Sequence, residues 1–180
     1  VLVYQDAISH VTLEPGSTAE SEKLDGIQQV FYVDEGAGTI SSDGKTYDLR
    51  NGNVFVVTPH FDFTMTATGD KPLAMYALTE PLPDGYDAKR ALEVGDRFKN
   101  NMGMNVHWAN IDRGIIGGLA NYGGMTLVTL DAMTIAQPHS HNEGIEECWI
   151  AVKGDIKLLL GKQFFDFPVG SVYKVPANGL

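Results

Sequence analysis

The sequence predicts an all-β fold in which one β-barrel unit occurs twice in tandem. The first observation behind this prediction is an internal repeat, because the run 24–36 aligns without a gap with the run 142–154. The matching pairs are Gly26 with Gly144, Ile27 with Ile145, Phe31 with Trp149 and Gly36 with Gly154. The same offset of 118 residues aligns Tyr47, Asp48, Gly52 and Val54 with Phe165, Asp166, Gly170 and Val172. Agreement over separate blocks indicates a duplicated unit.

The second observation is a series of short β-rich runs separated by turn residues. Six such runs are residues 30–33, 54–57, 73–78, 125–130, 148–152 and 156–160. Residues 42–45 and 50–53 contain Gly and Asn, which adopt positive φ at little cost and are typical of turns. Short strands at this spacing predict a sandwich or a barrel.

The repeat also predicts the domain boundaries. We expect a first barrel in residues 1–82, a linker in residues 83–106 and a second barrel in residues 107–180. The linker begins with a Pro- and Gly-containing stretch, and a short helix is expected near residues 88–94.

Composition excludes several classes of function. A formal charge of −10 and the lack of a basic cluster argue against a nucleic-acid partner, which would require Lys and Arg to neutralise phosphates. No run approaches the roughly 20 apolar residues that span a bilayer. We therefore expect a cytoplasmic protein with a small-molecule substrate, and a homodimer as the candidate assembly. Cys148 is the only cysteine, and we interpret it as an inert strand residue rather than a nucleophile.

One motif carries recognisable chemistry. His139 and His141 are one residue apart, so alternation along a strand would place both imidazoles on one face. Glu147 follows, and Gly154 comes seven residues after it. This pattern resembles the first conserved motif of the cupin superfamily. The competing interpretation is that both histidines are loop residues with ordinary hydrogen bonds.

The resemblance implies a bicupin, in which each unit is a cupin barrel, also called a double-stranded β-helix or jelly roll. It also implies that His139, His141 and Glu147 bind one divalent metal ion. Two imidazoles and a carboxylate suit iron, manganese, zinc or nickel, which the sequence cannot rank. Family members usually have four residues between the second His and the Glu, which fits Glu146, whereas the distance to Gly154 fits Glu147. We prefer Glu147, and Glu146 stays open as the alternative.

The first copy provides an internal comparison. Its residues at the positions of the three predicted ligands are Ser21, Lys23 and Gln29, which do not form a credible ligand set. A lysine would bring a positive charge to the place where a cation should bind. We therefore expect the first barrel to keep the fold without a metal ion.

The second copy departs from the family pattern near its end. The second cupin motif would add one more histidine, and here it would fall just past Leu180. We therefore expect a truncated sequence and a fourth metal ligand beyond Leu180; whether a leader precedes Val1 stays open.

Three functions remain in view. The leading hypothesis is a metal-dependent enzyme acting on a small oxygen-rich substrate, with isomerisation of a sugar or uronate favoured. The run 147–154 is similar to a run in the cupin domain of bacterial mannose-6-phosphate isomerases. Isomerisation needs a base beside the metal, and the candidates are Lys157, Tyr173 and Lys174. The alternative is that these three residues only form solvated strand faces. The alternatives are an iron-dependent dioxygenase and a small-molecule-binding cupin without turnover. The catalytic residues are otherwise unknown.

Overall fold

The computed structural model describes residues 6–22, 24–99, 101–106, 109–113, 126–135 and 147–175. In these ranges every element of regular secondary structure is a β-strand, which confirms the all-β prediction. The described residues contain no helix long and apolar enough to cross a membrane.

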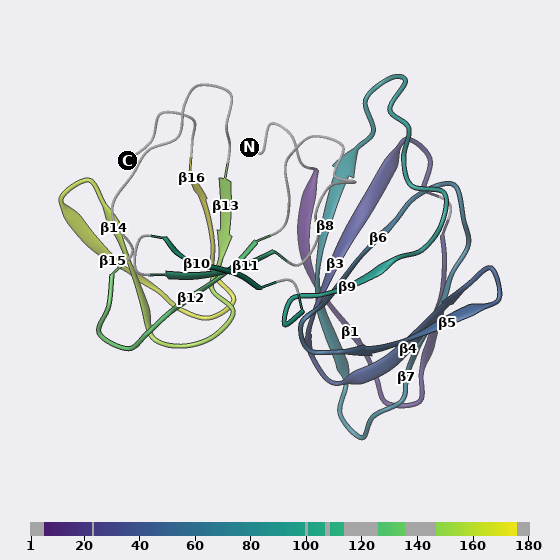
Figure 1. Cartoon of the computed structure of the whole chain (residues 1–180), viewed down its shortest axis with the longest axis horizontal. Coiled ribbons are helices and arrows are strands. Elements are labelled where there is room, and N and C mark those ends of the chain that lie inside the picture. The colour runs from purple at the N-terminus through teal and green to yellow at the C-terminus, as the bar shows by residue number, and fades with distance from the viewer. Residues whose placement is uncertain are drawn as a thin grey trace.

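The first half of the chain forms two sheets that pack against each other (Figure 1). The five-stranded sheet has the order β1-β8-β3-β6-β9, and the four-stranded sheet has the order β2-β7-β4-β5. Their bounds are β1 (Ala7–Leu13), β2 (Thr18–Glu20), β3 (Ile27–Glu35), β4 (Ala37–Ser42), β5 (Lys45–Arg50), β6 (Asn53–Val57), β7 (Thr64–Ala67), β8 (Leu73–Pro81) and β9 (Val94–Asp96). This arrangement is a jelly roll of the kind that the sequence predicts.

An apolar core fills the space between these two sheets. Strand β3 shows how the sequence produces it, because alternate side chains of a strand point to opposite faces. Phe31 and Val33 belong to the core, together with Ile40 and Leu49 from the opposite sheet. Phe31 stacks on Phe55, with ring centroids 5.2 Å apart. The other face of β3 carries Val30 and Tyr32, which belong to a second buried cluster.

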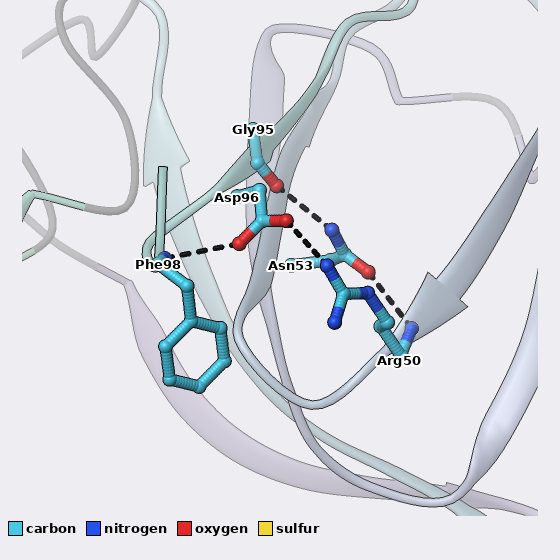
Figure 2. Close-up of polar contacts among 5 residues, drawn as sticks. All are labelled: Arg50, Asn53, Gly95, Asp96 and Phe98. Carbon is cyan, nitrogen blue, oxygen red and sulfur yellow. Dashed lines mark hydrogen bonds and ion pairs between the residues drawn. The ribbon is translucent and has the colours of Figure 1, made fainter. Parts of the chain in front are cut away.

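The region expected to be a linker contributes to this barrel. The short helix expected near residues 88–94 does not form, and residues 88–93 have no regular secondary structure. The strand β9 follows and pairs antiparallel with β6. Figure 2 shows the side chains that hold β9 in place: Arg50 Nη2 lies 2.7 Å from Asp96 Oδ2, and Asn53 Nδ2 donates to Gly95 O at 3.0 Å. The helix prediction was wrong because tertiary contacts outweigh local propensity in residues 88–94: Tyr47 Oη donates to Leu92 O at 3.2 Å, and Thr58 Oγ1 donates to Lys89 O at 2.7 Å.

The second half is also made of strands. Their bounds are β10 (Asn101–Val106), β11 (Ala109–Arg113), β12 (Thr126–Leu130), β13 (Glu147–Ile150), β14 (Ile156–Leu160), β15 (Gln163–Phe167) and β16 (Val172–Val175). The pairings are β10-β11-β12, β13-β16 and β14-β15. In Figure 1 this half lies beside the first, with β14 and β15 at the outer end.

Two strand pairs of the second half repeat two pairs of the first half in the same register. The partners Gln29↔Val57 and Phe31↔Phe55 of β3 and β6 recur as Glu147↔Val175 and Trp149↔Tyr173 of β13 and β16. The partners Gly38↔Leu49 and Ser42↔Lys45 of β4 and β5 recur as Ile156↔Phe167 and Leu160↔Gln163 of β14 and β15. Each residue in these pairs has moved by the same 118 positions that align the two copies in the sequence.

The two halves touch through the outer face of the five-stranded sheet. The buried cluster on this face contains Val30, Tyr32, Val54, Val56 and Tyr76. Leu127 of β12, Ile150 of β13 and Val152 pack against it from the second half. Since buried apolar area contributes roughly 25 cal/mol per Å², this contact stabilises the association of the two halves.

A pair of glycines at equivalent places in the repeat allows a matched test of the turns. Gly36 and Gly154 have φ values of +85° and +100°, a region that costs other residues about 1–2 kcal/mol. A Cβ on Gly36 would lie 2.2 Å from Pro72 O, whereas a Cβ on Gly154 would meet nothing within 4 Å.

We expect Gly36→Ala to lower the free energy of unfolding more than Gly154→Ala. Both variants carry the cost of positive φ, but only the first creates a backbone clash, which adds about 1–3 kcal/mol. Urea unfolding of both variants and the parent protein measures the difference. Equal losses would show that the close approach at Gly36 does not govern its cost.

Candidate functional site

The structure places one of the three predicted metal ligands, Glu147, at the start of β13. His139 and His141 lie outside the described residues, as do the alternative ligand Glu146 and Lys23 of the first copy. The meeting of His139, His141 and Glu147 therefore stays a prediction. The described residues contain no group of three or more His, Cys, Asp or Glu side chains that could hold a metal ion.

Strand alternation fixes the face that Glu147 uses. Ile150 of β13 packs on the cluster between the two halves, so Glu147 and Trp149 lie on the opposite face. In the first half the equivalent face of β3 carries Gln29 and Phe31, and Phe31 lies in the barrel core. Glu147 therefore lies on the face that corresponds to the barrel interior.

The neighbouring register position behaves differently in the first half. Gln28 aligns with Glu146 and shares a face with Val30, away from the core. There it is fully buried and donates from Nε2 to Glu80 Oε1 at 2.6 Å. This comparison favours Glu147 over Glu146 as the interior carboxylate.

The Glu147 side chain accepts a hydrogen bond from its own strand. Trp149 Nε1 donates to Glu147 Oε2 at 3.0 Å, and both side chains are half-buried. A carboxylate oxygen has two lone pairs and can accept this bond while also binding a second partner. A half-buried carboxylate on an interior face fits one place in a His, His and Glu donor set for a borderline divalent cation. Glu147 and Trp149 are two residues apart, which predicts that they share a strand face. The hydrogen bond between them is visible only in the structure.

The three candidate bases differ in their position relative to Glu147. Tyr173 of β16 is the register partner of Trp149, so it lies on the same interior face. Lys174 pairs with Cys148 on the opposite face. Lys157 is exposed on β14 and forms an ion pair with Asp166. The structure therefore brings only Tyr173, among these three, to the face of Glu147.

The interior face of β13 and β16 is more polar than the same face of the first half. At three aligned positions the first half has Gln29, Phe31 and Phe55, and the second half has Glu147, Trp149 and Tyr173. The second half thus gains a carboxylate, an indole N–H and a phenol hydroxyl. A face with these donors and acceptors can contact a polar ligand.

The equivalent positions of the first half have ordinary hydrogen bonds. Gln29 Nε2 donates to Thr79 Oγ1 at 3.2 Å, and Ser21 Oγ donates to Asp62 Oδ1 at 3.2 Å. The interior of this barrel is filled by buried apolar side chains, including Phe31 and Phe55. The expectation that this barrel lacks a metal ion stays a prediction.

Comparisons with known proteins identify the fold. Residues 9–79 match the family model described as Cupin domain. A structure of a protein from Pseudomonas aeruginosa, named for induction by glyoxylate, aligns with 96% of this chain at a TM-score of 0.74 and 14% identity. The structure of Ylba from E. coli, of the DUF861 family, aligns with 96% of the chain at a TM-score of 0.64 and 15% identity. Residues 9–79 are therefore similar to a cupin domain, and the chain has a cupin-like fold.

These comparisons concern the fold and not the function. The chain spans 66% and 69% of the lengths of these two solved proteins. At 14% and 15% identity the likeness shows the cupin fold alone, since this fold hosts many unrelated functions. No curated protein matches the sequence. The function of this chain must therefore be argued from its own residues.

Proposed function

We propose that this protein is a bicupin whose second unit binds one divalent metal ion through His139, His141 and Glu147. We further propose that it is an enzyme acting on a small oxygen-rich substrate, of which hydroxy-carbonyl sugars and uronates are the favoured class. The observation that carries the proposal is the interior face of β13 and β16, where Glu147, Trp149 and Tyr173 replace Gln29, Phe31 and Phe55.

The register of the strands supports the two-unit architecture. Two strand pairs of the first half align with two strand pairs of the second half at the constant offset of 118 residues. A turn hydrogen bond recurs at the same offset. Gly52 N donates to Val33 O at 2.9 Å, and Gly170 N donates to Ala151 O at 2.8 Å. Duplication explains this agreement, because a hydrogen-bond register depends on the position of every residue in both strands.

The metal supplies Lewis-acid chemistry when bound, which polarises a substrate oxygen. The other requirement of an isomerase is a group that moves a proton beside the substrate carbon. Tyr173 is suited to this role by its hydroxyl and its place opposite Trp149 on the face of Glu147. The first unit, with its filled apolar interior, acts as a scaffold that supports the second through the shared cluster around Val30 and Val56.

Metal analysis followed by turnover assays tests this proposal. Purified protein, loaded with each of iron, manganese, zinc and nickel, is assayed with hydroxy-carbonyl sugars and uronates with and without oxygen. We expect turnover that does not consume oxygen. Oxygen uptake with the iron form would instead support a dioxygenase, and substrate binding without any turnover would support a binding module.

We expect Tyr173→Phe to lower kcat by about 100-fold or more while metal affinity stays unchanged. General acid–base catalysis contributes roughly 10²–10⁴-fold, and this change removes only the hydroxyl. Phe is the residue at the equivalent position of the first half, so the fold accepts it. Lys174→Met, on the other face, is the matched control and should retain its kcat. A Tyr173→Phe variant with full kcat would remove Tyr173 from the mechanism.

A further inference from the structure

We propose that Trp149 is a positioning residue that orients Glu147 toward the metal ion through its indole N–H. The inference rests on the proposed function, because it concerns the same metal site. Trp149 is not one of the predicted metal ligands, and its proposed role is to hold the Glu147 carboxylate in one orientation.

The geometry of the contact supports this role. Trp149 Nε1 lies 3.0 Å from Glu147 Oε2, within the usual range of an N–H···O hydrogen bond. The indole nitrogen can only donate, and an ionised carboxylate can only accept. A hydrogen bond to a charged acceptor is roughly twice as strong as one between neutral groups. The bond therefore restricts the orientation of the Glu147 side chain.

The first unit shows what happens when the carboxylate is absent. Gln29 occupies the position of Glu147, and its amide donates to Thr79 Oγ1. Phe31 occupies the position of Trp149 and uses its ring to stack on Phe55. Phe31 shows that an aromatic ring without an N–H is sufficient for packing at this position. The indole N–H of Trp149 occurs in the half where the side chain two residues earlier is the carboxylate Glu147.

Rigid orientation has a consequence for metal binding. A glutamate loses side-chain freedom when it binds a metal, and a partner that already holds the carboxylate reduces that loss. Outer-shell partners of metal ligands typically affect affinity by about 10–100-fold when they are removed. Trp149 is such a partner for Glu147 within the described residues.

Cobalt binding by Trp149→Phe tests the inference. Phe keeps an aromatic ring and removes the N–H, as at position 31 of the first unit. Titration with Co²⁺ gives the Kd, and the visible absorption spectrum reports the ligand geometry. We expect the Kd to rise about 10-fold and the spectrum to change, while the melting temperature of the metal-free protein stays close to that of the parent.

Two further variants separate the possible causes. Cys148→Ala is the matched control, because Cys148 lies on the same strand but on the face opposite Glu147, and it should keep the parent Kd and spectrum. Glu147→Gln removes the proposed ligand itself and should lose most Co²⁺ binding. A parent protein that binds no Co²⁺ or an unaffected Glu147→Gln variant would overturn the proposed metal site. Normal binding by Trp149→Phe, beside a weakened Glu147→Gln, would overturn the positioning role alone.

A nuclear magnetic resonance measurement tests the same contact without a change at Trp149. The chain has two tryptophans, so the ¹H–¹⁵N spectrum should show two indole signals, and Trp108→Phe identifies that of Trp149. We expect the Trp149 signal to move on addition of Zn²⁺ and to move again in Glu147→Gln. A signal that ignores both changes would contradict the positioning role, even if Trp149→Phe fails to fold.

Discussion

Replacing His141 by alanine is expected to reduce divalent-metal affinity by about 100-fold. A structural zinc site with four protein ligands has a binding free energy of about 10–16 kcal/mol, so one ligand accounts for about 3 kcal/mol. Isothermal titration with Zn²⁺ and metal analysis of the purified protein measure the loss. Because the imidazole must be deprotonated to bind, affinity in the parent protein should also rise with pH through the histidine range.

His60 provides a control for this substitution. His60 is exposed and lies in the first half of the chain, between β6 and β7. His60→Ala should leave zinc affinity unchanged, whereas Glu147→Gln should weaken it as His141→Ala does. If all three variants bind zinc as the parent protein does, the ion does not bind at His141 and Glu147.

Phe55→Ala is expected to lower the free energy of unfolding by about 3–5 kcal/mol. Phe55 is fully buried in the core of the first barrel and stacks on its register partner Phe31. Truncating a buried Phe removes apolar contacts and leaves a cavity that the two packed sheets cannot close. A loss of this size is a large share of the 5–15 kcal/mol that stabilises a typical domain.

Urea unfolding with a matched variant checks this expectation. Phe164 lies on β15 with 65% of its surface exposed, so Phe164→Ala should change the free energy of unfolding by no more than about 0.5 kcal/mol. Similar losses in the two variants would mean that the buried core around Phe55 does not dominate stability.

The two units differ in what their interiors can do. The first fills its interior with stacked and branched apolar side chains, including Phe31, Phe55 and Val57. The second places Glu147 and Tyr173 on the corresponding face. The two halves contact each other through the apolar cluster around Val30 and Val56. This difference in side chains is the reason that the proposed site is placed in the second half.

Some properties of this protein follow from local sequence. The all-β class follows from short runs and turn glycines, because strand periodicity and positive φ depend on a few adjacent residues. Gly36 and Gly154 illustrate this point: both were aligned by the repeat, and both have positive φ. The offset of 118 residues was also visible in the sequence, and the same offset relates the strand partners. The candidate ligands His139, His141 and Glu147 came from motif spacing alone.

Other properties were decided by tertiary structure, because they depend on residues that are distant in the chain. Residues 94–96 form β9 because Asp96 and Gly95 find partners in Arg50 and Asn53. That Tyr173 and not Lys174 lies on the same strand face as Glu147 depends on the register of β13 with β16. The hydrogen bond from Trp149 to Glu147 requires a particular side-chain orientation on that face. Sequence patterns specify which residues alternate, whereas pairing and packing determine which face becomes the interior.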